Sequence, residues 1–144
     1  MGWMDGLGRV FNVVASASGV TIDLRKATAV TFVTYEDDGS TILTLTELDS
    51  TGTESEQALA VLDHGFKGPG VGGTWTAWTQ TAASTYDLAD DGTNDAVVVT
   101  VGADQLSDGY DSVQLTTDGG TVCAIVHDLT YQRGGASLPT SIVS

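Results

Sequence analysis

The sequence is short of cysteine and of positive charge. Its 144 residues include a single cysteine, Cys123, so an internal disulfide and zinc sites built from several cysteines are both excluded. Five Lys and Arg residues stand against 19 Asp and Glu, a net charge of −14, which repels phosphate backbones and anionic lipid headgroups. We therefore expect no direct nucleic-acid partner and no membrane partner.

Long hydrophobic runs are missing as well. No stretch approaches the roughly 18 to 20 apolar residues that span a bilayer. An Ala-Ser-Ala sequence at 15–17 resembles a signal-peptide cleavage site, but Asp5, Arg9 and Asn12 interrupt the apolar run that should precede it. We expect a soluble protein that begins at Met1 and is made in a cytoplasm.

Short alternating segments fill most of the chain, which has only two prolines and no long helical pattern. They predict about eight or nine strands in an all-β fold, an antiparallel β-sandwich or a partly closed barrel. The predicted division is an N-terminal arm or first strand at 1–18, a β-sandwich domain at 19–133 and a C-terminal tail at 134–144.

Two turns containing Asp-Gly predict hairpins. One joins Ala29–Glu36 to Thr41–Glu47, and the other joins Asp111–Thr116 to Thr121–Gln132. Two further segments lie between these predicted hairpins. The Gly-rich residues 64–73 predict a loop, and residues 96–101 (AVVVTV), apolar at both parities, predict a central strand covered on both faces.

The residues of a nucleophilic catalyst occur close together in VCAIVHDLTYQRGG, residues 122–135. On a strand, however, Cys123 and His127 share one face about 13 Å apart, and Asp128 points to the other face. A nucleophile and its base must lie about 3 Å apart. We therefore expect a strand rather than an active site, with Cys123 as a small core residue.

The other candidate sites are weak. The Asp-rich turn at 90–95 lacks the spacing of a calcium loop, and GPGVGG at 68–73 lacks the Lys-Ser/Thr of a phosphate-binding loop. Trp75 and Trp78 are three residues apart on a strand, so they face opposite ways and at least one should be buried. We expect no enzymatic activity, no cofactor and no metal site.

Three segments in order, TWTAWTQTAASTYD, AVVVTVGADQLSDGYDSVQL and VCAIVHDLTYQRGGASLP, resemble the small head proteins of tailed phages that infect actinobacteria. That family has a W-x-x-x-T-Q-x-A-A-x-T segment, then A-x-x-L-x-D-G-(Y/F), then A-x-x-H-D-L-x-x-Q-R…L-P. The resemblance covers roughly residues 27–139. The family has a Pro-Glu-Asn-like turn after the arginine, where Gly134 to Ser137 stand in this chain.

The resemblance implies a non-enzymatic virion protein that decorates and stabilises the capsid exterior, with the major capsid protein as partner. The oligomeric state stays open: the chain could self-associate as a trimer, or it could bind lattice sites as a monomer. Anchors should be apolar or arginine residues of the two terminal segments. The candidates are Trp3, Leu7, Arg9, Phe11, Arg133, Leu138 and Pro139.

Two alternatives remain open from the sequence. One is a tail-tube or head-tail joining subunit of the same kind of particle. The other is a carbohydrate-binding β-sandwich module, which would be favoured if Trp75 and Trp78 were both exposed.

Overall fold

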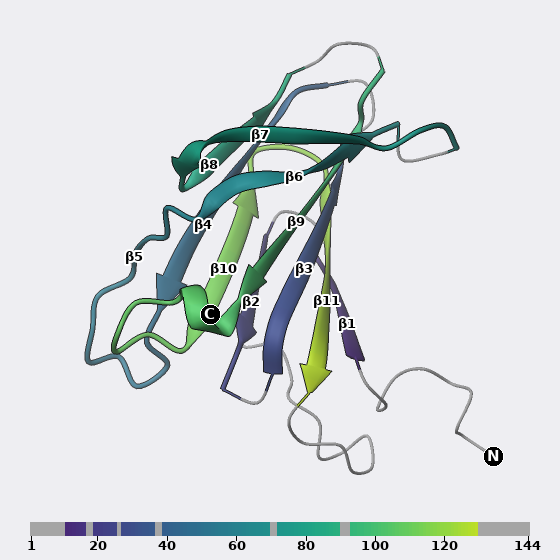
Figure 1. The fold of residues 1–144 in the computed structure, drawn as a ribbon. Coiled ribbons are helices and arrows are strands. Elements are labelled where there is room, and N and C mark those ends of the chain that lie inside the picture. The colour runs from purple at the N-terminus through teal and green to yellow at the C-terminus, as the bar shows by residue number, and fades with distance from the viewer. Residues whose placement is uncertain are drawn as a thin grey trace, which may run out of the picture.

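The described part of the chain forms two antiparallel sheets packed face to face (Figure 1). The computed structural model describes residues 11–16, 19–25, 27–36, 39–69, 72–89 and 93–129. Sheet A has six strands in the order β1 (Phe11–Ser16), β11 (Thr121–Leu129), β3 (Ala27–Tyr35), β9 (Ala96–Gly102), β6 (Leu62–Gly68) and β7 (Thr76–Ala83). The prediction of an antiparallel β-sandwich is confirmed, and both sheets are open rather than closed into a barrel.

Sheet B packs behind sheet A. Its strands are β2 (Gly19–Asp23), β10 (Ser112–Thr117), β4 (Thr41–Leu48) and β5 (Gln57–Ala58), and β8 (Thr85–Leu88) also pairs with β4. A single 3₁₀ turn, η1 (Ala103–Gln105), follows β9. The described residues thus hold more strands than the eight or nine expected, because short pieces such as the two residues of β5 add to the sheets.

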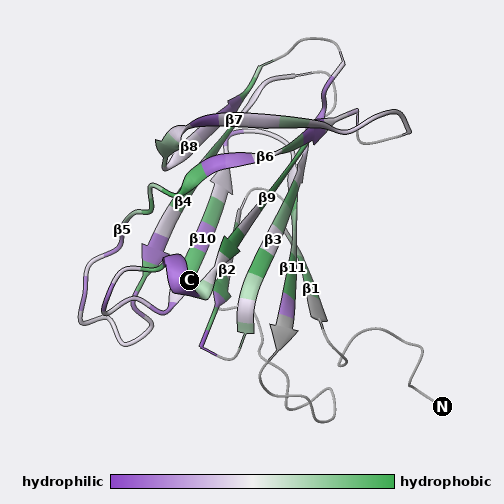
Figure 2. Cartoon of the chain, in the orientation of Figure 1, coloured by the Kyte–Doolittle hydropathy of each residue, from purple (hydrophilic) through white to green (hydrophobic). Residues whose placement is uncertain are grey.

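The core lies between the sheets and is built by alternation. Even-numbered residues of β3 and β11 and odd-numbered residues of β9 point inward, where they meet inward residues of β2, β4 and β10. Figure 2 shows hydrophobic segments along the central strands, including β3 and β9. The fully buried residues of this core include Phe32, Val99, Leu43, Leu45, Val113 and Leu115.

Both predicted hairpins are wrong. β3 and β4 do not pair with one another, because β3 lies in sheet A and β4 in sheet B; β10 and β11 are likewise in different sheets. The Asp-Gly turns therefore carry the chain across the sandwich. Gly120 has φ +78°, and a Cβ there would lie 2.2 Å from the carbonyl oxygen of Tyr35, so only glycine fits this crossing.

The predicted loop at 64–73 is also wrong in its first half, because β6 continues to Gly68. Gly65 marks a close approach rather than a loose backbone. A Cβ on Gly65 would lie 2.4 Å from the carbonyl oxygen of Val98 and 2.9 Å from the ring of Trp78. Strand β7 runs almost horizontally across the upper part of Figure 1, at a large angle to β3 and β11, as expected for the far strand of a twisted sheet.

Strand β9 is central in sheet A, as predicted, but its outer face is buried at Ala96 and not farther along the strand. Val97, Val99 and Val101 are buried in the core, whereas Val98 is partly exposed and Thr100 exposed on the outer face. The apolar residues at the outward-facing positions of β9 therefore form part of an apolar outer surface of sheet A, and no further layer of the described residues packs over Val98 and Thr100.

Candidate functional site

Both terminal segments are attached at the same end of the sandwich. Phe11, the first residue of β1, pairs with His127, and Leu129, the last residue of β11, pairs with Ala27. The N-terminal segment 1–10 joins the sandwich at Phe11, and the C-terminal segment 130–144 leaves it after Leu129. Because β1 and β11 are neighbouring strands, these two points are one strand spacing apart, about 5 Å across the sheet, and offset by two residues along it. We call this end of the sandwich the terminal end.

Of the predicted anchors, the structure places only Phe11 in a strand, at the start of β1. Trp3, Leu7, Arg9, Arg133, Leu138 and Pro139 lie outside the described residues. The structure therefore places Phe11 and Leu129, the strand residues next to the two terminal segments, on neighbouring strands. Nothing in the sequence showed this, since strands 1 and 11 meet only through sheet pairing.

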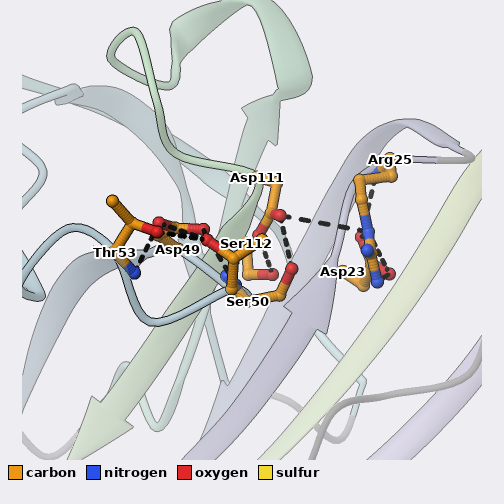
Figure 3. Close-up of polar contacts among 8 residues, drawn as sticks. Asp23, Arg25, Asp49, Ser50, Thr53, Asp111 and Ser112 are labelled. Atoms are coloured by element: carbon orange, nitrogen blue, oxygen red, sulfur yellow. Dashed lines mark hydrogen bonds and ion pairs between the residues drawn. The ribbon is translucent and has the colours of Figure 1, made fainter.

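The loops that follow β2 and β4 lie at the same end, because β3, which starts at Ala27 after β2, pairs there with Leu129. Figure 3 shows the polar contacts of these loops. Asp111 accepts hydrogen bonds from the hydroxyls of Ser50, at 2.5 Å, and Ser112, at 2.8 Å. The Arg25 guanidinium forms a two-point contact with Asp23, at 2.6 and 2.9 Å, and lies 4.0 Å from Asp111. Burial raises the pKa of Asp111, but these hydrogen bonds and Arg25 outweigh burial, so its pKa lies below the usual value.

Asp49 organises the loop after β4 in the same way. Its carboxylate accepts hydrogen bonds from the Thr51 hydroxyl and from the backbone N–H groups of Thr51, Thr53 and Glu54, at 2.7 to 3.0 Å. The Thr51 contacts are the main reason why the pKa of Asp49 is lowered. This loop therefore holds an ionised carboxylate in a fixed position at neutral pH.

A buried carboxylate ties the loops of the terminal end together. Glu47 is only 1% exposed, and it accepts hydrogen bonds from Gln57 Nε2 at 2.6 Å and from the backbone N–H of Ser107 at 2.8 Å. Tyr110 donates a hydrogen bond to the carbonyl oxygen of Ser55 at 2.8 Å. The segments 49–58 and 103–111 are therefore cross-linked by side chains, and the terminal end is rigid as well as acidic.

Two residues of the rejected catalytic hypothesis, Cys123 and His127, lie on the outer face of sheet A. Cys123 is partly exposed and pairs with Ala15 and Val33, so the expectation that it is a core residue is wrong. His127 shares that face, as the strand parity predicted, and its Nε2 lies 3.0 Å from the Thr31 hydroxyl. The cysteine points outward because the even residues of β11 fill the core.

The two tryptophans do lie on opposite faces of β7 and the segment before it. Trp78 is 6% exposed and stacks on Tyr86 with ring centroids 3.8 Å apart, whereas Trp75 is 46% exposed. Burial of at least one tryptophan is therefore confirmed. The surface with two exposed tryptophans that would have favoured carbohydrate binding is not formed.

Within the described ranges, no group of three or more His, Cys, Asp or Glu side chains is placed to hold a metal ion. Over the same residues, no helix is long and apolar enough to span a membrane. Those residues thus offer ordered acidic loops at one end and open sheet faces at the sides.

No protein-family model and no curated protein sequence matches this chain. Among solved structures, it is similar to the SPBc2 prophage-derived protein YomS, with 12% identity, a TM-score of 0.43, and coverage of 81% of this chain and 94% of that one. The tobacco streak virus coat protein has 12% identity, a TM-score of 0.25, and coverage of 85% and 89%. The carbohydrate-binding module CsCBM6-3 from Clostridium stercorarium, solved with cellobiose, has 13% identity, a TM-score of 0.26, and coverage of 83% and 69%.

These neighbours include a phage-derived protein and a virus coat protein. With identities of 12 to 13% and TM-scores below 0.5, the likenesses assign no family and no ligand to this chain.

Proposed function

We propose that this chain is a virion structural protein that decorates the outside of a phage capsid and stabilises its lattice, with the major capsid protein as partner. The observation that carries the proposal is the pairing of Phe11 with His127, which starts both terminal segments at one end of the sandwich. The resemblance of residues 27–139 to small phage head proteins supports the same role. No catalytic residue is part of it.

Two attachment segments that leave one rigid end give a physical basis for stabilisation. Once one segment binds a capsid subunit, the second binds at a high effective concentration, so that modest contacts give a long-lived attachment. A protein that binds only the assembled lattice stabilises it by RT ln(1 + [L]/Kd). The anchors proposed for these contacts are the predicted ones: Trp3, Leu7, Arg9, Phe11, Arg133, Leu138 and Pro139.

The first experiment measures the copy number of the chain in purified virions, with heads and tails separated. Hundreds of copies that fractionate with heads are expected. A few copies per particle would replace the proposal with the head-tail joining alternative, and abundance in tails would replace it with the tail-tube alternative. Absence from the virion would overturn all three.

The second experiment measures binding of the purified chain to expanded capsids that lack it. Trp3→Ala and Leu138→Ala should each weaken binding by more than about tenfold, because buried aromatic and apolar anchors dominate interface energies. Thr85→Ala, an exposed and uncharged change on β8, is the matched control and should bind as the wild type does. Unchanged binding of both terminal variants would contradict the role of the terminal segments.

A further inference from the structure

The outward positions of β1, β11, β3 and β9 in sheet A carry no Asp, Glu, Lys or Arg, and the charged groups beside this face lie on β6, where Asp63 contacts His64. One row of paired residues crosses all six strands and contains no polar side chain except a thiol. We call it the apolar row, and it consists of Ala15, Cys123, Val33, Val98, Phe66 and Ala77. Phe66 at one side of the sheet is 52% exposed.

The flanking rows also lack Asp, Glu, Lys and Arg, but they add threonine and tyrosine hydroxyls. Beside the apolar row lies the row Val13, Ile125, Thr31 and Thr100, in which Val13 is 40% exposed. On the other side lies the row Thr121, Tyr35, Ala96 and Gly68, with the exposed ring of Trp75 against Gly68. The fourth row consists of Phe11, His127, Ala29 and Gly102.

No Asp, Glu, Lys or Arg occupies any position of these four rows, although the chain holds 24 such residues, 19 of them acidic. From this we infer that the outer face of sheet A is a self-association surface, on which a second copy of this chain packs face to face about a two-fold axis. The inference does not depend on the proposed capsid function.

The net negative charge of the chain favours a second copy as the partner on this uncharged face. Two copies each carry a net charge of −14, so they repel wherever acidic surfaces meet. In a two-fold contact the same patch faces itself, and a patch without charged residues brings no like charges together. A basic partner would instead find its complement on the acidic loops of the terminal end, not on this face.

The size of the face is sufficient for a specific dimer. Six strands spaced about 4.8 Å apart and about 20 Å long give a flat area of nearly 600 Å². Two such faces bury at most about 1,150 Å², because Ala29, Ala96 and Gly68 are already buried within one chain; this maximum is close to the approximately 1,000 Å² expected of a biological interface. The exposed rings of Phe66 and Trp75 supply the aromatic anchors that dominate such contacts.

The test uses the full chain in sedimentation equilibrium between about 1 µM and about 1 mM, the range in which an interface of this size should dissociate. We expect a monomer–dimer equilibrium that strengthens as salt is raised, since salt screens the repulsion between acidic copies. Association that weakens with salt, or a monomer at every concentration, would overturn the inference.

Three substitutions locate the contact. Phe66→Lys should raise the dimer dissociation constant at least about tenfold. Phe66→Thr keeps strand propensity without adding charge, and should weaken the dimer in the same direction. Ile42→Lys is the matched control, because Ile42 is 40% exposed on the outer face of sheet B and the charge change equals that of Phe66→Lys. A dimer weakened by Ile42→Lys but not by the Phe66 variants would contradict the assignment.

Cys123 gives an independent readout, because this unique thiol lies in the apolar row. Its alkylation rate should fall several-fold as protein concentration passes through the dimer dissociation constant. A slow rate at every concentration in a monomeric chain would mean that another part of the same chain covers the face, which would also overturn the inference.

Discussion

The two outer faces of this sandwich differ although the two inner faces are alike. Sheet A presents the apolar row, whereas sheet B presents hydroxyl and amide groups, such as Gln114 in register with Thr46 and Thr116 in register with Thr44. Thr46 donates a hydrogen bond to Gln114 Oε1 at 3.3 Å. Ile42, a large exposed apolar residue of sheet B, lies beside Asp87 of β8.

This difference shows that a sheet of this sandwich can fold without an apolar outer face. Sheet B supplies inward Leu43, Leu45 and Leu115 to the core while its outer side is polar. A contiguous apolar patch reduces solubility and marks interaction surfaces in soluble proteins. The outer residues of sheet A are therefore best explained by a partner, and four changes test or sharpen the contrast.

The largest expected effect comes from breaking the strand contact that brings Phe66 into the apolar row. Gly65→Ala should destabilise the fold by about 3 kcal/mol, because its Cβ would meet the backbone of Val98 and the ring of Trp78. Gly52→Ala is the control, with φ +74° and open space, and should cost only about 1 kcal/mol. Urea unfolding measures both, and equal losses would show that β6 can move away from β9.

A second change makes sheet A resemble sheet B. The double variant Val33→Thr, Val98→Thr should fold with a loss of no more than about 2 kcal/mol, because both side chains are only partly buried and threonine favours strands. It should also require more ammonium sulfate to precipitate. The reverse change on sheet B, Thr44→Val with Thr116→Val, should require less. Equal precipitation points would show that the two faces do not differ in effective hydrophobicity.

Hydroxyl groups give a third comparison, between buried and outer threonines. Thr34 is fully buried in sheet A, and its hydroxyl has no hydrogen-bond partner among the described residues, so Thr34→Val should stabilise by about 1 kcal/mol. Thr46→Val removes the bond to Gln114 on sheet B and should destabilise by about 0.5 to 1 kcal/mol. Thermal unfolding measures the signs, and the same sign for both would contradict this account.

The smallest expected effect is on the stability of the fold at acid pH. Because Asp49 and Asp111 have lowered pKa values in the folded chain, their contribution to stability is present above their unfolded pKa near 3.8 and is lost as pH falls through the folded values. Asp49→Asn and Asp111→Asn should therefore lose less stability than the wild type between pH 5 and about pH 2. Asp87→Asn, on the outer side of sheet B, serves as the charge-matched control. A loss in the two variants as steep as that of the wild type would show that these hydrogen bonds do not favour the ionised carboxylates.

Much of the strand content could be predicted from the sequence, because alternation is a local property. In β3 and β11 the alternation placed Cys123 and His127 on one face of a single strand, and the structure agrees. The predicted anchors Trp3 and Leu138 could be tied to a site only through pairing of the first and last strands. That pairing carries no local signal.

Composition and alternation were enough to identify a compact acidic β protein and to show which residues share a strand face. Tertiary packing determines that the Asp-Gly turns cross between the sheets, that Cys123 faces outward, and that both terminal segments leave the sandwich at one end. The physical reason is that a strand's alternation and its turn residues are satisfied equally by a hairpin or by a crossing. The choice depends on which distant strands complete its hydrogen bonds and bury its inner face, and those energies exist only once the two sheets have assembled.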